Sequence, residues 1–439
     1  MMRRVELVSW RRVWLGMLLT VLAVYAALSI RQNVLNTVLT PRAAQDLHSY
    51  WYAGHFVRQG RDPYRSTLES QEPIFPVHYL DGLVNSGPSI RQPGIVTVPP
   101  NTAPYVLLLT PLAFFSWPYA KAIWLAINLV LMLALPALAW GLANRYGLEI
   151  GRTEWLCLAL VFFSLFPTRN AVGLGQTTLI TFLLMATTLL WLERPAAWAG
   201  VALGLALSKY SLVLPLLLFL IWQRKASVLA IATGVQLVSI FALAAVVRIR
   251  PAQVVVGYLD MFRDMFHRSA TQRLGIHLAV IFPPSPLYSL GIMIVGIVCL
   301  GYFWWRLRND NRGWRQLNAR GPAEFHILAI LALWSLLVVY HGTHDAVLVL
   351  LWFVVTVHAV SKKSVRPLGR GQKWVVIGVG GVAAIVLSAP NTLFLASPLA
   401  RDARWLTLWA ALPTLTLLAL LAVAVWLFEV LYLRRSMQA

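Results

Sequence analysis

The residues best suited to acid–base chemistry lie in a short stretch near the N-terminus, QDLHSYWYAGHFVRQGRDPY, residues 45–64. It follows a first apolar run, and its aromatic residues at helical spacing predict a short helix at headgroup depth. That spacing places Asp46 beside Ser49 and Tyr50. Desolvation near apolar surface raises the pKa of a carboxylate toward neutrality, which suits a general base. An aspartate that only stabilises a helix N-terminus is an equally good interpretation.

The segment that follows, up to residue 103, is rich in turns such as Asp62-Pro63-Tyr64 and Gly87-Pro88. Prolines at such spacing indicate a loop that is ordered by turns rather than by regular structure. Long ordered loops are unusual in compact folds, which suggests a binding role, with a simple external cap as the alternative.

A lysine inside an apolar stretch is the second candidate. Lys209 lies in ALGLALSKYSLVLPLLL, where a charge costs about 2.5–3.5 kcal/mol on membrane-insertion scales and needs a cavity or a partner. An anionic ligand would supply that partner. If the helix breaks at Ser208, the lysine instead snorkels from a helix end. Residues 196–222 are accordingly either one long helix or two half-helices.

Three titratable residues meet in YHGTHDAVLVLL, residues 340–351, at the predicted external junction of two helices. His341, His344 and Asp345 carry side chains that ligate divalent metals in other proteins. Three such residues in one turn are more often a hydrogen-bonded cap. The sequence therefore predicts neither a metal nor another cofactor here.

Two further segments carry polar residues. Residues 256–278, VGYLDMFRDMFHRSATQRLGIHL, predict an amphipathic surface helix whose charges are solvated or paired. The stretch TRNAVGLGQTTLI, residues 168–180, places Arg169, Asn170 and Gln176 around two glycines between apolar runs. This pattern is typical of an unwound or re-entrant segment. Its Gly-x-Gly alone is weak evidence for a phosphate site.

The elements that must position these residues are membrane helices. Of the 439 residues, 59% are hydrophobic and 12% charged, and the mean hydropathy of +0.69 lies outside the range of soluble domains. Apolar runs long enough to cross a bilayer recur, and no segment alternates like an outer-membrane barrel strand. The sequence predicts an all-α, polytopic transmembrane bundle of about twelve helices.

The formal charge of +21 lies mainly in short interhelical loops and at the two ends. Because cytoplasmic loops have this pattern, we expect no nucleic-acid partner and place both termini in the cytoplasm. The long polar segments 31–103 and 249–286 then lie outside and carry short interfacial helices. The two cysteines, Cys157 and Cys299, fall within predicted helices, which argues against a disulfide framework.

Three motifs, in this order, resemble the family 87 glycosyltransferases, membrane enzymes of the GT-C class related to actinobacterial polyprenyl-phosphate-mannose-dependent mannosyltransferases. They are DLHSYWYAGHFVRQGRDPY, then GLGQTTLI followed by WAGVALGLALSKYSLVLPLLLFLIWQRK, and finally HDAVLVLL. The resemblance covers about residues 10–360. We therefore expect a GT-C-like catalytic core in residues 1–286, completed by the helices of residues 287–439.

The resemblance implies inverting transfer of a hexose, usually mannose, from a polyprenyl-phosphate sugar to a lipid or glycan acceptor. The reaction would take place among membrane lipids, on the external face of a bacterial plasma membrane. Asp46 matches the family's catalytic aspartate and would be the general base. Lys209 is the expected partner of the donor phosphate, with Arg91, His341 and His344 as helpers. The expected substrate contacts are Tyr50, Trp51, Tyr52, Tyr64, Gln176, Gln272 and Asp345.

Two points of this expectation are open. Where relatives tend to carry an Asn-Gln-Ser run, this chain has SATQRLGIHL, so that only Gln272 matches. The tyrosines and the tryptophan that follow Asp46 either stack on the sugar or anchor the helix at the interface, and anchoring is the simpler role.

A polytopic transporter or a flippase of lipid-linked glycans is the alternative function. It would also contain broken helices and intramembrane charge, but it predicts inverted repeats and ionisable residues paired near the bilayer midplane. The sequence has no fixed-period repeat. A noncatalytic envelope scaffold, and a ligase that uses a pyrophosphate-linked oligosaccharide, also remain open.

Overall fold

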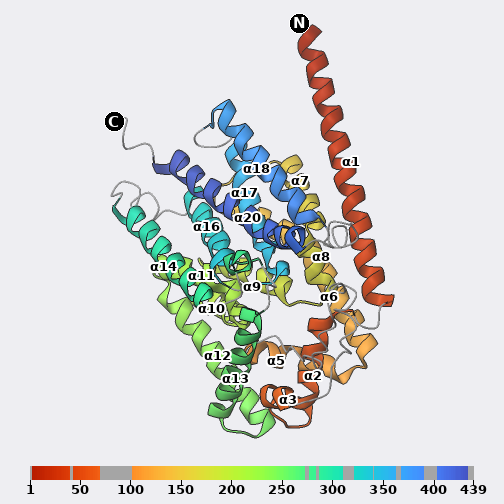
Figure 1. Cartoon of the computed structure of the whole chain (residues 1–439), viewed down its shortest axis with the longest axis vertical. Coiled ribbons are helices and arrows are strands. Elements are labelled where there is room, and N and C mark those ends of the chain that lie inside the picture. Colours follow the sequence, from red (N-terminus) through yellow and green to blue (C-terminus); the bar gives the residue numbers. More distant parts are fainter. Residues whose placement is uncertain are drawn as a thin grey trace.

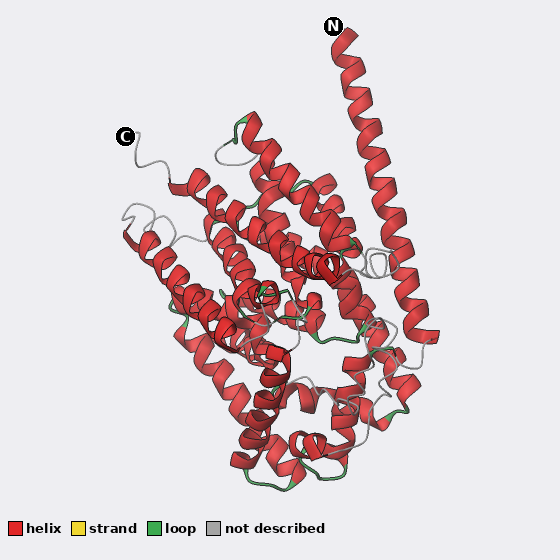
Figure 2. Ribbon diagram, in the orientation of Figure 1, coloured by secondary structure: helices red, strands yellow, loops and turns green. Residues whose placement is uncertain are grey.

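The computed structural model describes residues 2–39, 43–69, 101–271, 276–282, 286–309, 321–339, 341–361, 367–389 and 403–433. Within these ranges the regular elements are helices and none is a strand (Figures 1 and 2). The predicted all-α class is therefore confirmed. Helices suit such an apolar chain because they satisfy every backbone polar group within one segment when lipid surrounds it.

The elements follow one another in the chain with these bounds: α1 (Met2–Leu39), α2 (Gln45–Arg58), α3 (Pro63–Glu69), α5 (Ala103–Leu109), η1 (Thr110–Phe114), α6 (Trp117–Arg145), α7 (Arg152–Ser164), α8 (Phe166–Gly173), α9 (Thr178–Trp191), α10 (Ala196–Ala206), η2 (Leu207–Lys209), α11 (Tyr210–Trp222), α12 (Ala226–Val247), α13 (Pro251–Thr271), η3 (Leu278–Ile281), α14 (Pro286–Asn309), α16 (Pro322–Val338), η4 (Thr343–Leu348), α17 (Val349–Val360), α18 (Arg370–Ser388), α20 (Ala403–Phe428) and η6 (Glu429–Leu433).

Seven helices among the described residues are long and apolar enough to cross a membrane, or eight if the bent pair α7–α8 is one span. Four shorter apolar helices accompany them, at Ala103–Phe114, Thr178–Trp191, Leu290–Trp305 and Pro322–Val338. A multi-pass membrane protein is thereby confirmed. The predicted number of about twelve crossings is reached only if the shorter helices cross as well.

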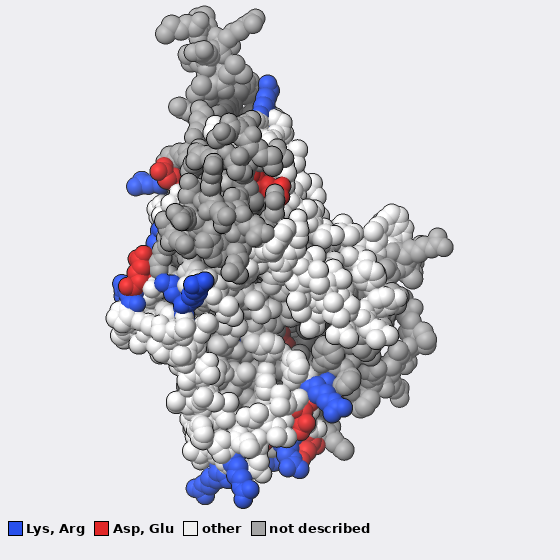
Figure 3. All heavy atoms as spheres, turned by 90° about the vertical axis from the view of Figure 1, so that its left-hand side faces the viewer, with Lys and Arg blue, Asp and Glu red and all other residues white. Residues whose placement is uncertain are grey.

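The surface agrees with a membrane environment. Large apolar side chains are exposed on several of the long helices, for example Val21 on α1 (64%), Val238 on α12 (68%) and Val295 on α14 (62%). On the face shown in Figure 3, the described charged side chains gather in a lower and an upper group, and the surface between them carries almost no charge. A band of this kind is what lipid tails require.

The short helices gather at one end of the molecule. α2, α3, α5 and α13 lie together at the lower end of Figure 1, whereas α1 starts at the opposite end. α1 extends to Leu39, into the segment 31–103 that the sequence predicts to lie outside the membrane, because neither glycine nor proline interrupts residues 31–39. The C-terminal helices α16 and α17 share one apolar core with α6, α9 and α11. A division at residue 286 stays a prediction.

Residues 196–222 form one span with a tight turn at its centre. The 3₁₀ turn η2 joins α10 to α11 and ends at Lys209. Lys209 itself has non-helical dihedral angles, with φ −116° and ψ 66°. The released carbonyl of Ser208 accepts a hydrogen bond from the Thr102 N–H at 3.3 Å. Of the two predicted alternatives, the single span is therefore right, with a local distortion at the lysine.

α10 and α12 pack closely through two glycines of α10 that are four residues apart. A Cβ on Gly200 would lie 2.6 Å from the Ile231 Cβ, and one on Gly204 would lie 2.5 Å from the Val235 Cβ. Small residues at this spacing allow membrane helices to approach each other. These glycines thus hold the lysine-bearing span against α12.

We predict that Gly204→Ala lowers the free energy of unfolding by about 1–3 kcal/mol, because the added methyl group overpacks the contact with α12. The control is Gly234→Ala on α12, whose Cβ would meet nothing within 4 Å. Thermal unfolding in nanodiscs measures both. Equal stability of the two variants would contradict the packing described.

Candidate active site

α2 begins where it docks on the turn between α8 and α9. The Ala44 N–H donates to the Gly173 carbonyl at 3.0 Å. The Asp46 N–H donates to the Leu174 carbonyl, also at 3.0 Å. These bonds satisfy donors that a helix start leaves without an intrahelical partner. The turn therefore fixes the position of Asp46.

Gly175 makes this close docking feasible. Its φ of +67° is in the left-handed region, and a Cβ there would lie 2.7 Å from the Leu47 Cβ. Its carbonyl accepts a hydrogen bond from Trp124 Nε1 at 2.9 Å. Only glycine meets both demands without strain. The Gly-x-Gly stretch is thus explained by packing against α2 and not by phosphate contact.

Asp46 lies partly buried in the first turn of α2, where its Oδ2 accepts a hydrogen bond from Gln176 Nε2. Desolvation raises the pKa of Asp46 from 3.8 to about 6, and it outweighs the lowering effects of that bond and of the Lys209 charge. A carboxylate that only stabilised the helix start would have a lowered pKa. The raised value favours the general-base interpretation.

Lys209 is the second partner of Gln176 and is itself paired. Its Nζ donates to Gln176 Oε1 at 3.2 Å and lies 2.7 Å from Asp345 Oδ1. Thr178 Oγ1 joins both, accepting from the lysine at 2.5 Å and donating to the Asp345 carboxylate at 3.0 Å. The two charged side chains are only 11% and 4% exposed. The lysine therefore has a countercharge within the chain.

His341, which lies just before η4, and His344, which lies within it, have different surroundings. His341 Nδ1 lies 3.1 Å from Asp345 Oδ2, and its Nε2 lies 3.3 Å from Ser335 Oγ. Both of its ring nitrogens are thus engaged, and the residue has no exposed surface. His344 Nε2 lies 3.5 Å from Asp345 Oδ1, while its Nδ1 has no hydrogen-bond partner among the described residues. Of the two histidines, only His344 has a ring nitrogen without a partner among the described residues, and that nitrogen is buried.

Contacts between tyrosines connect α2, the helix that carries Asp46, to α3, α13 and α11. Asn101 Nδ2 donates to the hydroxyl of Tyr50, and the Asn101 carbonyl accepts from the Tyr64 hydroxyl at 3.1 Å. The Tyr64 ring packs edge-on against Tyr258 of α13, at 5.7 Å between centroids. Tyr258 in turn hydrogen-bonds Tyr210, the neighbour of Lys209 in the chain. These contacts thus link α2, α3, α11 and α13 to one another beside the site.

Trp51 and Tyr52 lie on a different side of α2 from Asp46. The Trp51 Nε1 donates to the Phe115 carbonyl at 3.0 Å, and the ring lies near His48 and His55, as helical spacing predicts. Tyr52 stacks on His48 with centroids 6.4 Å apart. These contacts support anchoring of α2. Their predicted contact with substrate stays a prediction.

The structure thus brings together Asp46, Gln176, Lys209, His341, His344 and Asp345. Tyr50 interacts with Asp46, and Tyr64 is linked to Tyr50 through Asn101. Arg91 and Gln272 lie outside the described residues. No group of three His, Cys, Asp or Glu side chains in the described part of the chain could hold a metal ion.

Three residues that contribute hydrogen bonds to the site were not predicted from the sequence. Thr178 bridges the ion pair, Asn101 joins two tyrosines and Ser335 meets His341. Only Thr178 carried a usable signal, because it follows Gln176 at the start of an apolar run. The other two come from distant segments, so that nothing in the local sequence marks them.

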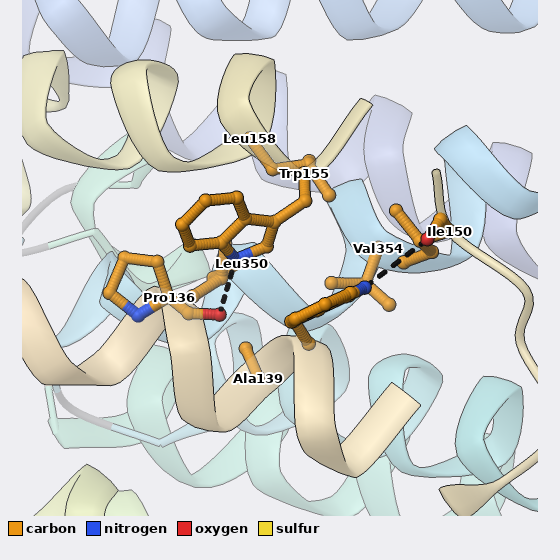
Figure 4. A pocket seen from close by; sticks show the side chains of 8 residues that line it. Pro136, Ala139, Ile150, Trp155, Leu158, Leu350 and Val354 are labelled. Carbon is orange, nitrogen blue, oxygen red and sulfur yellow. Dashed lines mark hydrogen bonds between the residues drawn. The ribbon is translucent and has the colours of Figure 1, made fainter. Parts of the chain in front are cut away.

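A small cavity of about 10 Å³ lies away from these polar residues, between α6, α7 and α17. Figure 4 shows its apolar lining and two indole groups, with Trp155 Nε1 donating to the Pro136 carbonyl and Trp140 Nε1 to the Ile150 carbonyl. No titratable side chain lines it. It is a packing gap without candidate chemistry.

Comparison with known proteins gives one match. The sequence model of a family described as Glycosyltransferase family 87 matches residues 101–321, half of the chain. No curated protein and no solved structure matches. The matched residues include the turn with Gln176, the span with Lys209 and helix α13.

Breaking the buried ion pair should be costly. We predict that Lys209→Met or Asp345→Asn alone lowers the free energy of unfolding by about 3–5 kcal/mol, because each leaves a buried polar group without its partner. The double variant should cost clearly less than the sum. The exposed pair Arg145–Glu193 supplies the control, since Arg145→Gln should cost under about 1 kcal/mol. Strict additivity of the buried pair in denaturant unfolding would contradict this.

The Asp46 carboxyl should destabilise the protein at neutral pH. Its folded-state pKa of about 6 exceeds 3.8, so the folded chain binds this proton more tightly and stability falls as pH rises between these values. We predict that Asp46→Asn raises the free energy of unfolding at pH 8 by about 1–2 kcal/mol and leaves it nearly unchanged at pH 3. Asp260→Asn on exposed α13 is the control. A loss of stability at pH 8 would contradict the raised pKa.

Proposed function

Because the chain belongs to glycosyltransferase family 87, we propose that it transfers a hexose, with mannose as first choice, from a polyprenyl-phosphate donor to a lipid or glycan acceptor. Glycosyl transfer by a membrane protein follows from the family and from the apolar helices. What we propose beyond this is the identity of the donor, the identity of the sugar and the roles of the individual residues.

One observation supports it above the others: the partly buried Asp46, held by Gln176, has a pKa of about 6. A base with this pKa is ionised at neutral pH yet still binds a proton well. The Gln176 amide fixes which carboxylate oxygen is engaged, because its Nε2 donates to Oδ2. Oδ1 is then the oxygen that meets the acceptor hydroxyl.

The reaction is a single displacement. The acceptor oxygen attacks the anomeric carbon and forms the new glycosidic bond, while the bond from that carbon to the donor phosphate breaks on the opposite face. The hydroxyl proton passes to Asp46, and the electron pair leaves with the phosphate. This geometry inverts the anomeric configuration. No metal is needed in this scheme, because the donor phosphodiester carries one negative charge and hydrogen-bond donors are able to stabilise the second charge that develops on the phosphate as it leaves.

We assign the leaving phosphate to Lys209 and His344. The three N–H donors of Lys209 meet Asp345, Gln176 and Thr178, so the lysine would contact the phosphate by exchanging one of these partners. His344 adds its Nδ1, which has no partner among the described residues. His341 acts through Asp345 and positions it. Arg91 remains a proposed helper from outside the described ranges.

We place this site on the external face of a bacterial plasma membrane, with both termini in the cytoplasm. The charge pattern of the loops supports this orientation. α2, α3 and α13 lie at the end of the molecule away from the start of α1 (Figure 1), which agrees with it. A lipid donor and a water-side acceptor would meet at that boundary.

A transporter is the second candidate, and one observation favours it. The Lys209–Asp345 pair joins the middle of the span Ala196–Trp222 to the beginning of the span Thr343–Val360. Ionisable residues paired within a bundle are common in transport proteins. Family membership weighs against this reading. The transfer assay decides between the two.

We predict that purified wild-type protein in nanodiscs transfers radiolabel from polyprenyl-phosphate-mannose to extracted membrane lipids or glycans. Asp46→Asn should lower the rate by at least about a hundredfold, because it removes the general base. In the wild type, kcat/KM should fall as pH drops below about 6, where Asp46 becomes protonated. Asp260→Asn is the matched control and should retain full activity.

Equal activity of wild type and Asp46→Asn would contradict the role of Asp46 and leave glycosyl transfer standing. A folded wild type that is inactive with mannose, glucose and arabinose donors would contradict the proposed donor class and favour the transporter.

A further inference from the structure

Arg169 is a buried charge that the proposed reaction does not use. It lies on α8, 8% exposed, between α1 and the C-terminal end of α18. Its Nη2 donates to the Ser388 carbonyl at 2.6 Å and to the Tyr25 hydroxyl at 3.3 Å, and its Nη1 lies 3.4 Å from Ser29 Oγ. All of these partners are neutral.

The guanidinium has no ion pair with a carboxylate among the described residues. Its other contacts are the rings of Tyr25 and Phe166, at 5.5 and 5.8 Å from the guanidinium carbon. The Ser388 carbonyl accepts a hydrogen bond from one of the five guanidinium N–H groups, as is favourable for a cation at a helix C-terminus. Nε has no hydrogen-bond partner in the described part of the chain. A charge with so few partners is costly inside a membrane protein.

The position of Arg169 suits a lipid headgroup. Ser388 is the last residue of the candidate span α18, so its carbonyl marks the depth at which that span ends. On α1, Tyr25 and Ser29 are flanked by apolar side chains that face outward, namely Val21, Val24 and Leu28, each more than half exposed. A lipid that lies along α1 would bring its headgroup to the Nη1 side of the guanidinium. Basic pockets between membrane helices bind headgroup phosphates in this way.

We propose that Arg169, with Ser29 and Tyr25, forms a binding site for the phosphate of an anionic membrane lipid. The phosphate oxygens would accept from Nη1 and from the two hydroxyl groups, which supplies a countercharge that the described residues do not provide. The site is separate from Asp46 and does not depend on glycosyl transfer.

The site is also connected to the candidate active site. The next residue, Asn170, donates from Nδ2 to Thr343 Oγ1 at 2.8 Å, and Thr343 precedes His344 in the chain. α8 therefore contacts the lipid site on one side and η4 on the other. A lipid bound at Arg169 would hold η4 in place, so that headgroup binding and the position of His344 are coupled.

The test uses native mass spectrometry of the full-length, detergent-purified protein with added dioleoylphosphatidylglycerol. Wild type should retain this lipid in preference to dioleoylphosphatidylcholine. Arg169→Gln should weaken binding about fivefold, the effect expected for one arginine near a membrane surface. Arg58→Gln, which removes an exposed arginine on α2, is the matched control and should bind like wild type. Undecaprenyl phosphate should compete, because phosphate is the group recognised.

A second variant covers the case in which Arg169→Gln does not fold. Ser29→Leu keeps the Arg169 charge and replaces the hydroxyl 3.4 Å from Nη1 with a bulkier apolar side chain, so it should weaken phosphatidylglycerol binding as much. Wild-type binding by folded Ser29→Leu, or equal binding by Arg169→Gln and Arg58→Gln, would overturn the proposal. Competition by inorganic phosphate at the same concentration would overturn the assignment to a lipid.

Discussion

A lysine and an aspartate inside an apolar helical bundle must stay together, because either charge alone would be stranded in a medium that solvates it poorly. The Lys209 Nζ lies 2.7 Å from Asp345 Oδ1, and this contact joins the tight turn in the middle of one span to the start of another. Around it, Thr178 and His341 satisfy the remaining lone pairs of the carboxylate. The pair thereby fixes α9, α11 and η4 relative to one another.

Gln176 extends this constraint to the short helix α2. The contact with Lys209 sets the orientation of the Gln176 side-chain amide. Its Oε1 accepts a hydrogen bond from Lys209, and its Nε2 therefore faces Asp46 and donates to it. Gly175 makes the approach of α2 feasible. The Asp46 carboxylate is thus held by a charge pair inside the helical bundle. Its raised pKa results because one amide hydrogen bond only partly replaces the lost water.

The apolar runs predicted the helical class, and helical spacing predicted the neighbours of Asp46. The sequence also marked Asp46, Lys209 and Asp345 as candidates, since each is a titratable group beside apolar residues. It did not show that Lys209 and Asp345 are partners. Their distance is set by the packing of α9, α11 and η4, and no local pattern encodes it. The same limit applies to Asn101 and Ser335, whose partners are far along the chain.

The proposed role of Asp46 depends on a pKa that burial raises to about 6 and that the single hydrogen bond from Gln176 lowers only in part. The most direct measurement is an infrared titration of the wild type in nanodiscs, with Asp46→Asn as the reference that assigns the carboxyl band. We expect the band of the protonated Asp46 carboxyl to disappear as the pH rises, with a midpoint near pH 6. A midpoint at the ordinary value of 3.8 would contradict it.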